Sequence, residues 1–276
     1  MRATSATLKQ AGRRVALVPT MGALHGGHVA LMRQARSQGT AVVVSIYVNP
    51  TQFGPHEDFQ QYPRDLEADG KLCQHEQVDA IFAPSDAEMY PGGTGEGTAE
   101  ATWVEETALS RRFEGERRPG HFRGVCTVVA KLFNIVQPDQ AVFGQKDYQQ
   151  LKVVQRMVRD LCLPIEIVAT PTVREPDGLA MSSRNQMLSP SERAQATVLW
   201  KALSVAHDLF KDGEHDPRRL EAAMQRAVSL APAARLDYAK VVDGDSLEPV
   251  HKVQPSNVAL LAAHVGKVRL IDNLIL

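Results

Sequence analysis

The chain has 276 residues, which at roughly 100–200 residues per domain predicts one large domain or two modest ones. Its 31 Lys and Arg residues nearly balance its 32 Asp and Glu residues, and the net charge of −1 lacks the basic excess of proteins that bind nucleic-acid phosphates. With 43% hydrophobic and 23% charged residues, the composition excludes a mainly disordered, collagen-like or coiled-coil chain. We therefore expect a globular protein whose partners are small molecules and not nucleic acid.

The sequence has no run of 18 apolar residues, so we expect no transmembrane helix and no membrane partner. The first 14 residues (MRATSATLKQAGRR) lack the apolar core of a signal peptide. Cys73, Cys126 and Cys162 are far apart and show no CxxC spacing, which is typical of reduced thiols. Together these features predict a cytoplasmic protein.

The first half of the sequence alternates strand-like with helix-like segments. Strand composition occurs at 14–18, 41–48, 78–82, 141–143 and 165–169, and helical composition at 29–36, 65–77, 124–136 and 147–161. The run AVVVSIYV at 41–48 is almost wholly apolar, as in a parallel strand covered on both faces. This alternation predicts an α/β fold with a Rossmann-like, doubly wound parallel sheet.

The alternation stops near residues 170–185. Two helical stretches follow at 190–211 and 217–230, and then three strand-like runs at 236–242, 257–263 and 268–274. Helices followed by consecutive strands indicate a smaller C-terminal α+β domain. We place the boundary so that residues 1–172 form the Rossmann-like domain and 173–276 the small one. The glycine-rich segment 91–98 (PGGTGEGT) is expected to be a loop, either a mobile flap or a plain connection.

Residues 19–28 (PTMGALHGGH) leave a predicted strand, pass three glycines and enter a predicted helix. Ligands bind at the carboxyl ends of strands in open α/β sheets, and the N–H groups at a helix start favour phosphate. His25 and His28 are three residues apart and share one helical face, so both imidazoles can bond to one phosphate region. We interpret the segment as a phosphate site; the alternative is a glycine-rich turn whose histidines are incidental. It is not a P-loop, because G-x-x-x-x-G-K-[ST] is absent.

The HGGH sequence at 25–28 resembles the HIGH motif of the nucleotidyltransferase and class I synthetase superfamily. Three further segments narrow the resemblance: SIYVNPTQFGPHEDFQQYPRD, RPGHFRGVCTVVAKLFNIVQPDQAVFGQKDYQQL and TVREPDGLAMSSRN. They resemble the pantothenate synthetase (pantoate–β-alanine ligase) family, nearly end to end and including the closing RLIDN. The resemblance implies an ATP-dependent ligase that joins (R)-pantoate to β-alanine through a pantoyl-adenylate intermediate, with pantothenate, AMP and pyrophosphate as products.

The resemblance implies an ATP site built from three segments, the third of which lies where distant relatives have a KMSKS-like loop. Its residues are Met21, Gly22, Ala23, Leu24, His25, Gly26, Gly27, His28, Gly144, Gln145, Lys146, Asp147, Val173, Met181, Ser182, Ser183 and Arg184. The expected catalytic residues are His28, His25 and Lys146, because imidazole and ammonium groups stabilise charge on phosphates. His28 is the expected acid toward the departing pyrophosphate. The small C-terminal domain is expected to close over this site and exclude water.

The predicted pantoate and β-alanine site combines Gln52 and Asn49 of NPTQF with Gln150 and Arg118. Neutral amides suit a ligand that carries hydroxyls and a carboxylate, whereas Arg118 suits a carboxylate or phosphate. Taken alone, NPTQF is typical of a turn and 114–122 (EGERRPGHF) of a surface loop. Because His25, Gln52 and Lys146 each lie just past a predicted strand, we expect these three side chains to surround one cleft.

Mg²⁺ is the expected cofactor beside ATP, but the sequence shows no cluster of metal ligands, and Asp69 is only a weak candidate. The resemblance also implies a homodimer, in which 101–105 (ATWVE) could supply an interface strand. Two other functions remain open: another nucleotidyltransferase of the same superfamily, or a non-catalytic nucleotide-binding regulator. The first would not be expected to carry NPTQF or GQKDYQQ, and the second would need no histidine pair, lysine and glutamines for a second substrate.

Overall fold

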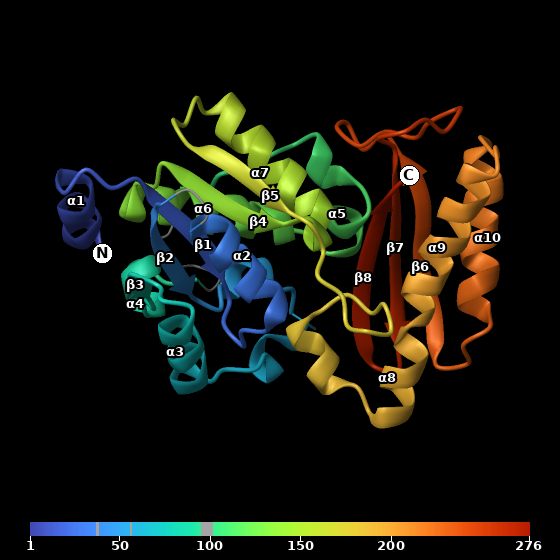
Figure 1. Ribbon diagram of the computed structural model, residues 1–276, viewed down its shortest axis with the longest axis horizontal. Helices are drawn as coiled ribbons and strands as arrows, with labels where there is room; N and C mark the ends of the chain where they lie inside the picture. Colours follow the sequence, from blue (N-terminus) through green and yellow to red (C-terminus); the bar gives the residue numbers. More distant parts are fainter. Residues whose placement is uncertain (37–38, 56, 95–101) are drawn as a thin grey trace. The chain divides into compact units, whose positions relative to one another are not determined.

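The computed structural model describes residues 1–36, 39–55, 57–94 and 102–276, and the chain divides into two compact units (Figure 1). The first unit contains Met1–Gln145 and Gln149–Pro171, and the second contains Lys146–Tyr148 and Thr172–Leu276. The main division is thus one residue from the predicted boundary. The segment Lys146–Tyr148, which the sequence assigned to the first domain, groups with the second unit.

The first unit is built on a parallel sheet of five strands in the order β3-β2-β1-β4-β5. The strands are β1 (Val15–Thr20), β2 (Ala41–Ile46), β3 (Ala80–Phe82), β4 (Gln140–Gly144) and β5 (Glu166–Thr170). The longest helices between them are α2 (Gly26–Arg36), α3 (Leu66–His75), α6 (His121–Val136) and α7 (Tyr148–Asp160). This arrangement confirms the predicted doubly wound α/β sheet.

Alternate strand residues face opposite sides of this sheet, and apolar side chains occupy both sides. On one side, residues of β1, β2 and β4 pack with α2 and α3 in a cluster formed by Ala16, Val18, Met32, Ala35, Val42, Val44, Cys73 and Val142. Helices α6 and α7 lie on the other side (Figure 1). The chain reverses its direction of winding between β1 and β4, which are neighbours in the sheet, so ligands are expected at the carboxyl ends of these two strands.

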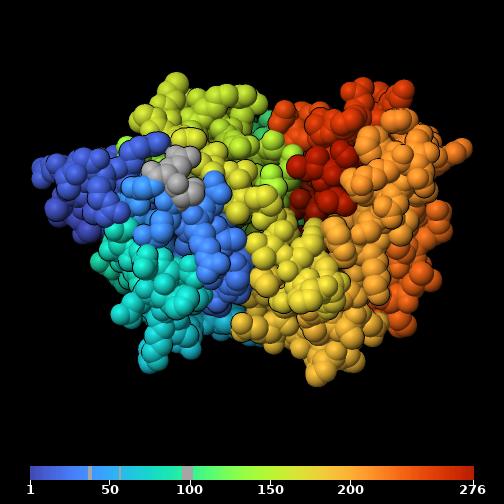
Figure 2. Space-filling view, viewed as in Figure 1, coloured from blue at the N-terminus to red at the C-terminus, as the bar shows by residue number. Residues whose placement is uncertain are grey.

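Shorter elements complete the first unit. They are α1 (Arg2–Gln10), η1 (Pro50–Gln52), η2 (Asp58–Gln61), α4 (Asp86–Met89), η3 (Leu109–Arg111), α5 (Glu114–Arg117) and η4 (Gln145–Asp147), the last of which crosses into the second unit. The sequence did not predict α1, a mostly polar helix in which only Ser5 is buried and which projects from its unit in the space-filling view (Figure 2).

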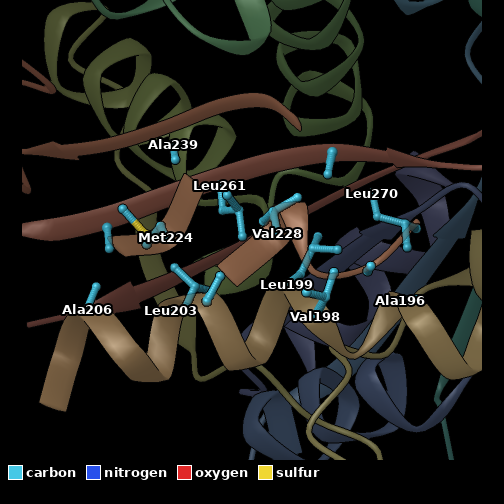
Figure 3. Packing of buried hydrophobic residues seen from close by; sticks show 14 of the residues in the cluster. Ala196, Val198, Leu199, Leu203, Ala206, Met224, Val228, Ala239, Leu261 and Leu270 are labelled. Atoms are coloured by element: carbon cyan, nitrogen blue, oxygen red, sulfur yellow. The ribbon is translucent and has the colours of Figure 1, made fainter. Parts of the chain in front are cut away.

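The second unit has an antiparallel sheet of β6 (Ala234–Val242), β7 (Val258–Val265) and β8 (Val268–Ile275). Helices α8 (Pro190–Ala196), α9 (Val198–Lys211) and α10 (Pro217–Ser229) accompany it, and η5 (Ser183–Met187) precedes them. Leucine, valine and alanine side chains of α9 and α10 interdigitate with those of the sheet (Figure 3). This unit confirms the predicted small α+β region.

Two local differences from the predicted elements stand out, and one predicted loop lies partly outside the described residues. The stretch 190–211 is two helices and not one, because Thr197 ends α8 and turns its hydroxyl back to the Ala194 carbonyl, 3.0 Å away. Residues 102–105 of the proposed interface segment are not in a strand, and residue 101 lies outside the described residues. The predicted loop 91–98 is described only up to residue 94. No helix in the described parts of the chain is long and apolar enough to span a membrane.

Candidate active site

The loop that follows β1 is shaped by a carboxylate from α3. Gly22 has a φ of +82°, and a Cβ at this position would lie 2.8 Å from Asp69 Oδ2, so only glycine fits there. Asp69 Oδ2 accepts a hydrogen bond from Ala23 N at 3.0 Å, and Oδ1 accepts one from Leu24 N at 2.7 Å. Asp69 is only 3% exposed. It therefore holds the backbone of the predicted phosphate loop, a role that sequence spacing did not reveal.

The two histidines at the start of α2 are oriented by backbone N–H groups. Gly27 N donates to His25 Nδ1 at 3.1 Å, and His25 N donates to His28 Nδ1 at 3.2 Å. The two rings lie close together, with 4.2 Å between centroids. Because each Nδ1 accepts a hydrogen bond, each neutral ring carries its proton on Nε2. The pair can therefore donate two N–H groups to an anion beside the helix start.

Asp69 was also the weak candidate for a metal ligand. Each of its oxygens already accepts a backbone N–H bond. Among the described residues there is no group of three or more His, Cys, Asp or Glu side chains that could hold a metal ion. The metal role of Asp69 stays a prediction.

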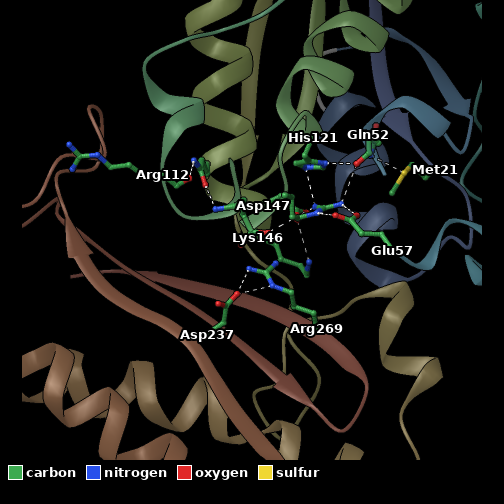
Figure 4. Close-up of polar contacts among 12 residues, drawn as sticks. Met21, Gln52, Glu57, Arg112, His121, Lys146, Asp147, Asp237 and Arg269 are labelled. Carbon is green, nitrogen blue, oxygen red and sulfur yellow. Dashed lines mark hydrogen bonds and ion pairs between the residues drawn. The ribbon is translucent and has the colours of Figure 1, made fainter. Parts of the chain in front are cut away.

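Gln52 ends η1, the short 3-10 helix after β2, and is 8% exposed. Its Oε1 accepts a hydrogen bond from Asn49 Nδ2 at 3.1 Å, and its Nε2 donates to Met21 Sδ at 3.1 Å. The structure therefore brings Gln52 beside the loop that follows β1, as Figure 4 shows. Asn49 is more deeply buried, at 1% exposed, and its side chain bonds to protein groups.

Arg118 lies beside Gln52 but is engaged by protein partners. Its Nε and Nη2 donate to the Glu57 carboxylate at 2.9 and 2.6 Å, and its Nη1 lies 3.1 Å from His121 Nε2. His121 Nδ1 in turn donates to the Gln52 carbonyl at 2.8 Å (Figure 4). The sequence analysis missed Glu57 and His121, because 61 residues separate Glu57 from Arg118 and 69 separate His121 from Gln52.

A cavity of about 360 Å³ opens at the carboxyl ends of β1, β2 and β3. Its lining includes Met21, Gly22 and Asp69, together with residues that follow β2 and β3 such as Tyr47 and Asp86. This hollow lies on the carboxyl edge of the sheet but toward β2 and β3, beside the β1–β4 switch point, and its lining does not include His25, His28 or Gln52.

At the end of β4, the predicted site residues are divided between the units. Gly144 and Gln145 belong to the first unit, where β4 pairs with β1 in parallel, so they lie on the same edge of the sheet as the loop after β1. Gln150 also belongs to the first unit, is half-buried and lies near the start of α7. Lys146 and Asp147 belong to the second unit. That Lys146 shares one cleft with His25 and Gln52 stays a prediction.

In the second unit, Lys146 is held by its backbone. The Asn273 side-chain amide of β8 donates to the Lys146 carbonyl at 2.8 Å, and Tyr148 Oη donates to the Gly244 carbonyl at 3.0 Å. Lys146 Nζ lies 3.6 Å from Asp147 Oδ1 (Figure 4). This anchoring explains why Lys146–Tyr148 groups with the C-terminal sheet.

The third predicted ATP segment folds as a closed loop. Met181 N donates to the Val173 carbonyl at 2.9 Å, which closes the loop across its base. Ser182 then caps η5 by accepting from Arg184 N at 3.3 Å, and Ser183 is buried at 6% exposed. The acceptor role uses an oxygen lone pair of Ser182, so its O–H remains a donor.

A buried ion pair fastens this loop to β8. The Arg174 guanidinium donates to both oxygens of Asp272 at 2.6 and 2.9 Å and stacks 3.9 Å above the Trp200 ring. Burial raises the pKa of the Asp272 carboxyl, whereas the hydrogen bonds and charge of Arg174 act to lower it. The neighbouring residues Asp272 and Asn273 therefore tie the Val173–Arg184 and Lys146 segments to one strand.

Comparisons with known proteins show the family of the chain. Residues 1–275 match the family described as pantoate-beta-alanine ligase. The chain is 52% identical to the pantothenate synthetase of Thermotoga neapolitana, over all of this chain and 96% of that one. The crystal structure of pantothenate synthetase from Thermus thermophilus matches with a TM-score of 0.91 and 47% identity, covering 98% of this chain and 97% of that one.

A third similar protein was solved with ligands. It is the pantoate-beta-alanine ligase of Francisella tularensis, whose structure is described as a complex with beta-gamma ATP and beta-alanine. It shares 33% identity and a TM-score of 0.78, covering 99% of this chain and 94% of that one. The sequence match, the matching folds and the arrangement of the strand-end loops lead to one conclusion: the chain belongs to the pantoate–β-alanine ligase family of enzymes.

Proposed function

We propose that this chain condenses (R)-pantoate with β-alanine at the expense of ATP, through a pantoyl-adenylate intermediate. Family membership and the ATP and β-alanine complex of the Francisella relative support the two ligands. The observation that carries the proposal is the start of α2, where backbone N–H groups turn His25 and His28 so that each neutral ring bears its proton on Nε2. Two such donors beside a helix N-terminus suit a polyphosphate.

The reaction has two group transfers. A carboxylate oxygen of pantoate attacks the α-phosphorus of ATP, the bond from that phosphorus to the bridging oxygen breaks, and pyrophosphate leaves. The β-alanine amine then attacks the carbonyl carbon of the mixed anhydride. AMP leaves, the new amide nitrogen loses a proton, and pantothenate is released. Activation is needed because a free carboxylate is a poor electrophile.

The protein contributes mainly charge stabilisation to the first transfer. In our proposal, His25 and His28 donate from Nε2 to phosphate oxygens, and His28 bonds to the departing pyrophosphate. The other cationic and hydroxyl donors to the phosphates are Lys146, Ser182, Ser183 and Arg184. The backbone around ATP is formed by the remaining residues of the predicted site, which are Met21–Leu24, Gly26, Gly27, Gly144, Gln145, Asp147, Val173 and Met181.

For pantoate and β-alanine, we propose direct contacts from Gln52 and Gln150. Asn49 and Arg118, which the sequence analysis placed in the same site, act mainly by holding Gln52. Asn49 bonds to the side chain of Gln52, and Arg118 bonds to His121, which binds the Gln52 carbonyl. This division of roles follows from their burial and from their protein partners.

Mg²⁺ enters the proposal as the ion bound by the triphosphate of ATP. The described residues offer no metal-ligand cluster, and both Asp69 oxygens accept backbone bonds. No step attributed to the protein passes through the metal. A cytoplasmic location and a homodimer complete the proposal, and sedimentation velocity of the purified chain tests the dimer.

Isotope exchange tests the proposed intermediate. With ATP, Mg²⁺ and pantoate but no β-alanine, labelled pyrophosphate is expected to enter ATP, because pantoyl adenylate forms reversibly. Omission of pantoate is the control and is expected to abolish the exchange. A strict requirement for β-alanine would favour a concerted reaction, and exchange without pantoate would overturn the substrate assignment in favour of another nucleotidyltransferase. Absence of exchange under all conditions would overturn the adenylate route.

A further inference from the structure

Tyr90 is a deeply buried polar side chain that the proposed mechanism does not yet use. It directly follows α4 and is 2% exposed. Lys131 of α6 places its Nζ 4.1 Å from the Tyr90 ring centroid and donates to the Met89 carbonyl at 2.7 Å. These contacts fix the ring, and therefore the direction in which its hydroxyl points.

The Tyr90 hydroxyl is one of three donors that hold the oxygen of the Asn49 amide. Tyr90 Oη donates to Asn49 Oδ1 at 2.9 Å, and Thr51 donates to the same oxygen from Oγ1 at 2.9 Å and from its backbone N at 3.3 Å. A backbone N–H can only donate, so the Asn49 atom on this side is the oxygen. Asn49 Nδ2 consequently faces the other way, where the Gly124 carbonyl, which can only accept, lies 3.2 Å away.

The orientation of Asn49 then fixes the orientation of Gln52. Asn49 Nδ2 also donates to Gln52 Oε1 at 3.1 Å, so the oxygen of the Gln52 amide is engaged by the protein. The Gln52 Nε2 group is turned toward the loop after β1, where it meets the thioether sulfur of Met21 at 3.1 Å. A thioether is a weak acceptor, and an oxygen of a ligand is a stronger one.

We infer that Tyr90 is a positioning residue that, by donating to Asn49 Oδ1 together with Thr51, helps to hold Gln52 as a hydrogen-bond donor toward an oxygen of pantoate. The inference rests on the proposed function, since it takes Gln52 as a pantoate contact. It explains why a buried tyrosine and a buried asparagine accompany a partly accessible glutamine. An unfixed glutamine amide presents its oxygen as readily as its nitrogen, and the oxygen would repel a carboxylate or a hydroxyl lone pair.

Tyr90→Phe tests the inference because it removes only the hydroxyl. The KM for pantoate in the pyrophosphate exchange is expected to rise about fivefold, which is typical for the loss of one buried hydrogen bond, with the KM for ATP within twofold of wild type. Thr197→Val is the matched control, because Thr197 is 7% exposed and its hydroxyl donates to the Ala194 carbonyl at 3.0 Å in the second unit. It is expected to lower the melting temperature similarly but to leave the KM for pantoate within twofold.

A double-mutant cycle separates positioning from a general loss of stability. In a Gln52→Ala background, Tyr90→Phe is expected to change the KM for pantoate by less than 1.5-fold, because the group that Tyr90 orients is gone. A fivefold effect that persists in that background would overturn the inference, as would equal effects of Thr197→Val and Tyr90→Phe on the KM for pantoate. If wild type shows pantoate-dependent exchange and Tyr90→Phe matches it, the inference alone fails. If wild type shows no such exchange, the proposed function fails and the inference fails with it.

Discussion

The two units hold their predicted ATP loops by different physical means. In the first unit, the loop after β1 is fastened through its backbone, because Asp69 accepts the N–H groups of Ala23 and Leu24. In the second unit, the loop Val173–Arg184 is fastened through a side chain, because Arg174 pairs with Asp272 and stacks on Trp200.

The difference reflects which groups each sheet has available to hold a neighbouring loop. A parallel sheet ends in a row of strand-to-helix loops whose N–H groups lack partners, so a neighbouring carboxylate can hold them. The antiparallel sheet satisfies its own backbone groups in its ladders, so a loop beside it is held by side chains that project from a strand. A backbone clamp fixes the shape of a loop, whereas an ion pair fixes its attachment.

The largest effect on stability is expected from breaking the buried ion pair between Arg174 and Asp272. Arg174→Met leaves the Asp272 carboxylate buried without its partner and is expected to cost about 3–5 kcal/mol in the free energy of unfolding. Chemical denaturation monitored by tryptophan fluorescence measures this loss. Burial raises the pKa of Asp272, so the protonated folded form is favoured at low pH. Loss of Arg174 raises this pKa further, so the deficit of the variant is expected to grow as the pH rises through the raised pKa that Asp272 has in the wild-type protein.

Two controls sharpen this prediction. Replacing both partners, as Arg174→Met with Asp272→Leu, is expected to recover most of the loss, because no unpaired charge remains buried. Arg193→Met removes an exposed pair with Asp177 in the same unit and is expected to cost less than about 1 kcal/mol. Equal losses in Arg174→Met and Arg193→Met would contradict the buried clamp.

One catalytic group from each unit is expected to matter similarly for the rate. His28→Ala and Lys146→Met each remove a donor that stabilises transition-state charge, which typically costs ~10²–10³ in rate, or about 3–4 kcal/mol. Rapid-quench measurement of adenylate formation tests both, with unfolding midpoints to show that the fold is retained. Lys71→Met, which removes an exposed lysine on α3, serves as the control for loss of charge. Near-wild-type rates in both variants would remove the two residues from the mechanism.

A smaller effect is expected from weakening the hydrogen bonds that Asp69 accepts from the backbone N–H groups of Ala23 and Leu24. Asp69→Asn turns one accepting oxygen into a donor that faces a backbone N–H, at a cost of about 1–3 kcal/mol in stability, and we expect a higher KM for ATP. Asp65→Asn is the matched control, because Asp65 caps α3 from an exposed position and asparagine caps equally well. An Asp69→Asn protein with the stability and KM of Asp65→Asn would show that the loop holds its shape unaided.

The elements of both sheets could be predicted from the sequence because apolar runs and helical stripes are local patterns. The strand at 41–48 and the helix at 217–230 were found in this way, within two residues of β2 and α10. Polar α1 gave no apolar stripe, and Thr197 broke a continuous helical pattern through one side-chain hydrogen bond. The helix α1 and the break between α8 and α9 were mispredicted because neither produces a periodic pattern of apolar residues in the sequence.

The candidate site was predictable only where its residues follow strands. The histidine pair and Gln52 belong to segments next to β1 and β2, and motif resemblance marked them. Their supports could not be found in this way, since Asp69 reaches Leu24 across 45 residues and His121 reaches Gln52 across 69. Such partners depend on tertiary packing, which places distant carboxylates and imidazoles beside a loop without any sequence spacing.

The anchoring of Lys146 to β8 has a consequence for exchanging parts between relatives. The chain passes between the units at Gln145, again after Tyr148 and once more after Pro171. In a chimera joined at residue 171, Lys146 and Tyr148 would come from one parent and their hydrogen-bond partners Asn273 and Gly244 from the other. The position of Lys146 would therefore depend on a sheet from a different protein. A chimera that is to keep the native surroundings of Lys146 must therefore take residues 146–148 from the same parent as the C-terminal sheet, although they precede the junction in the sequence.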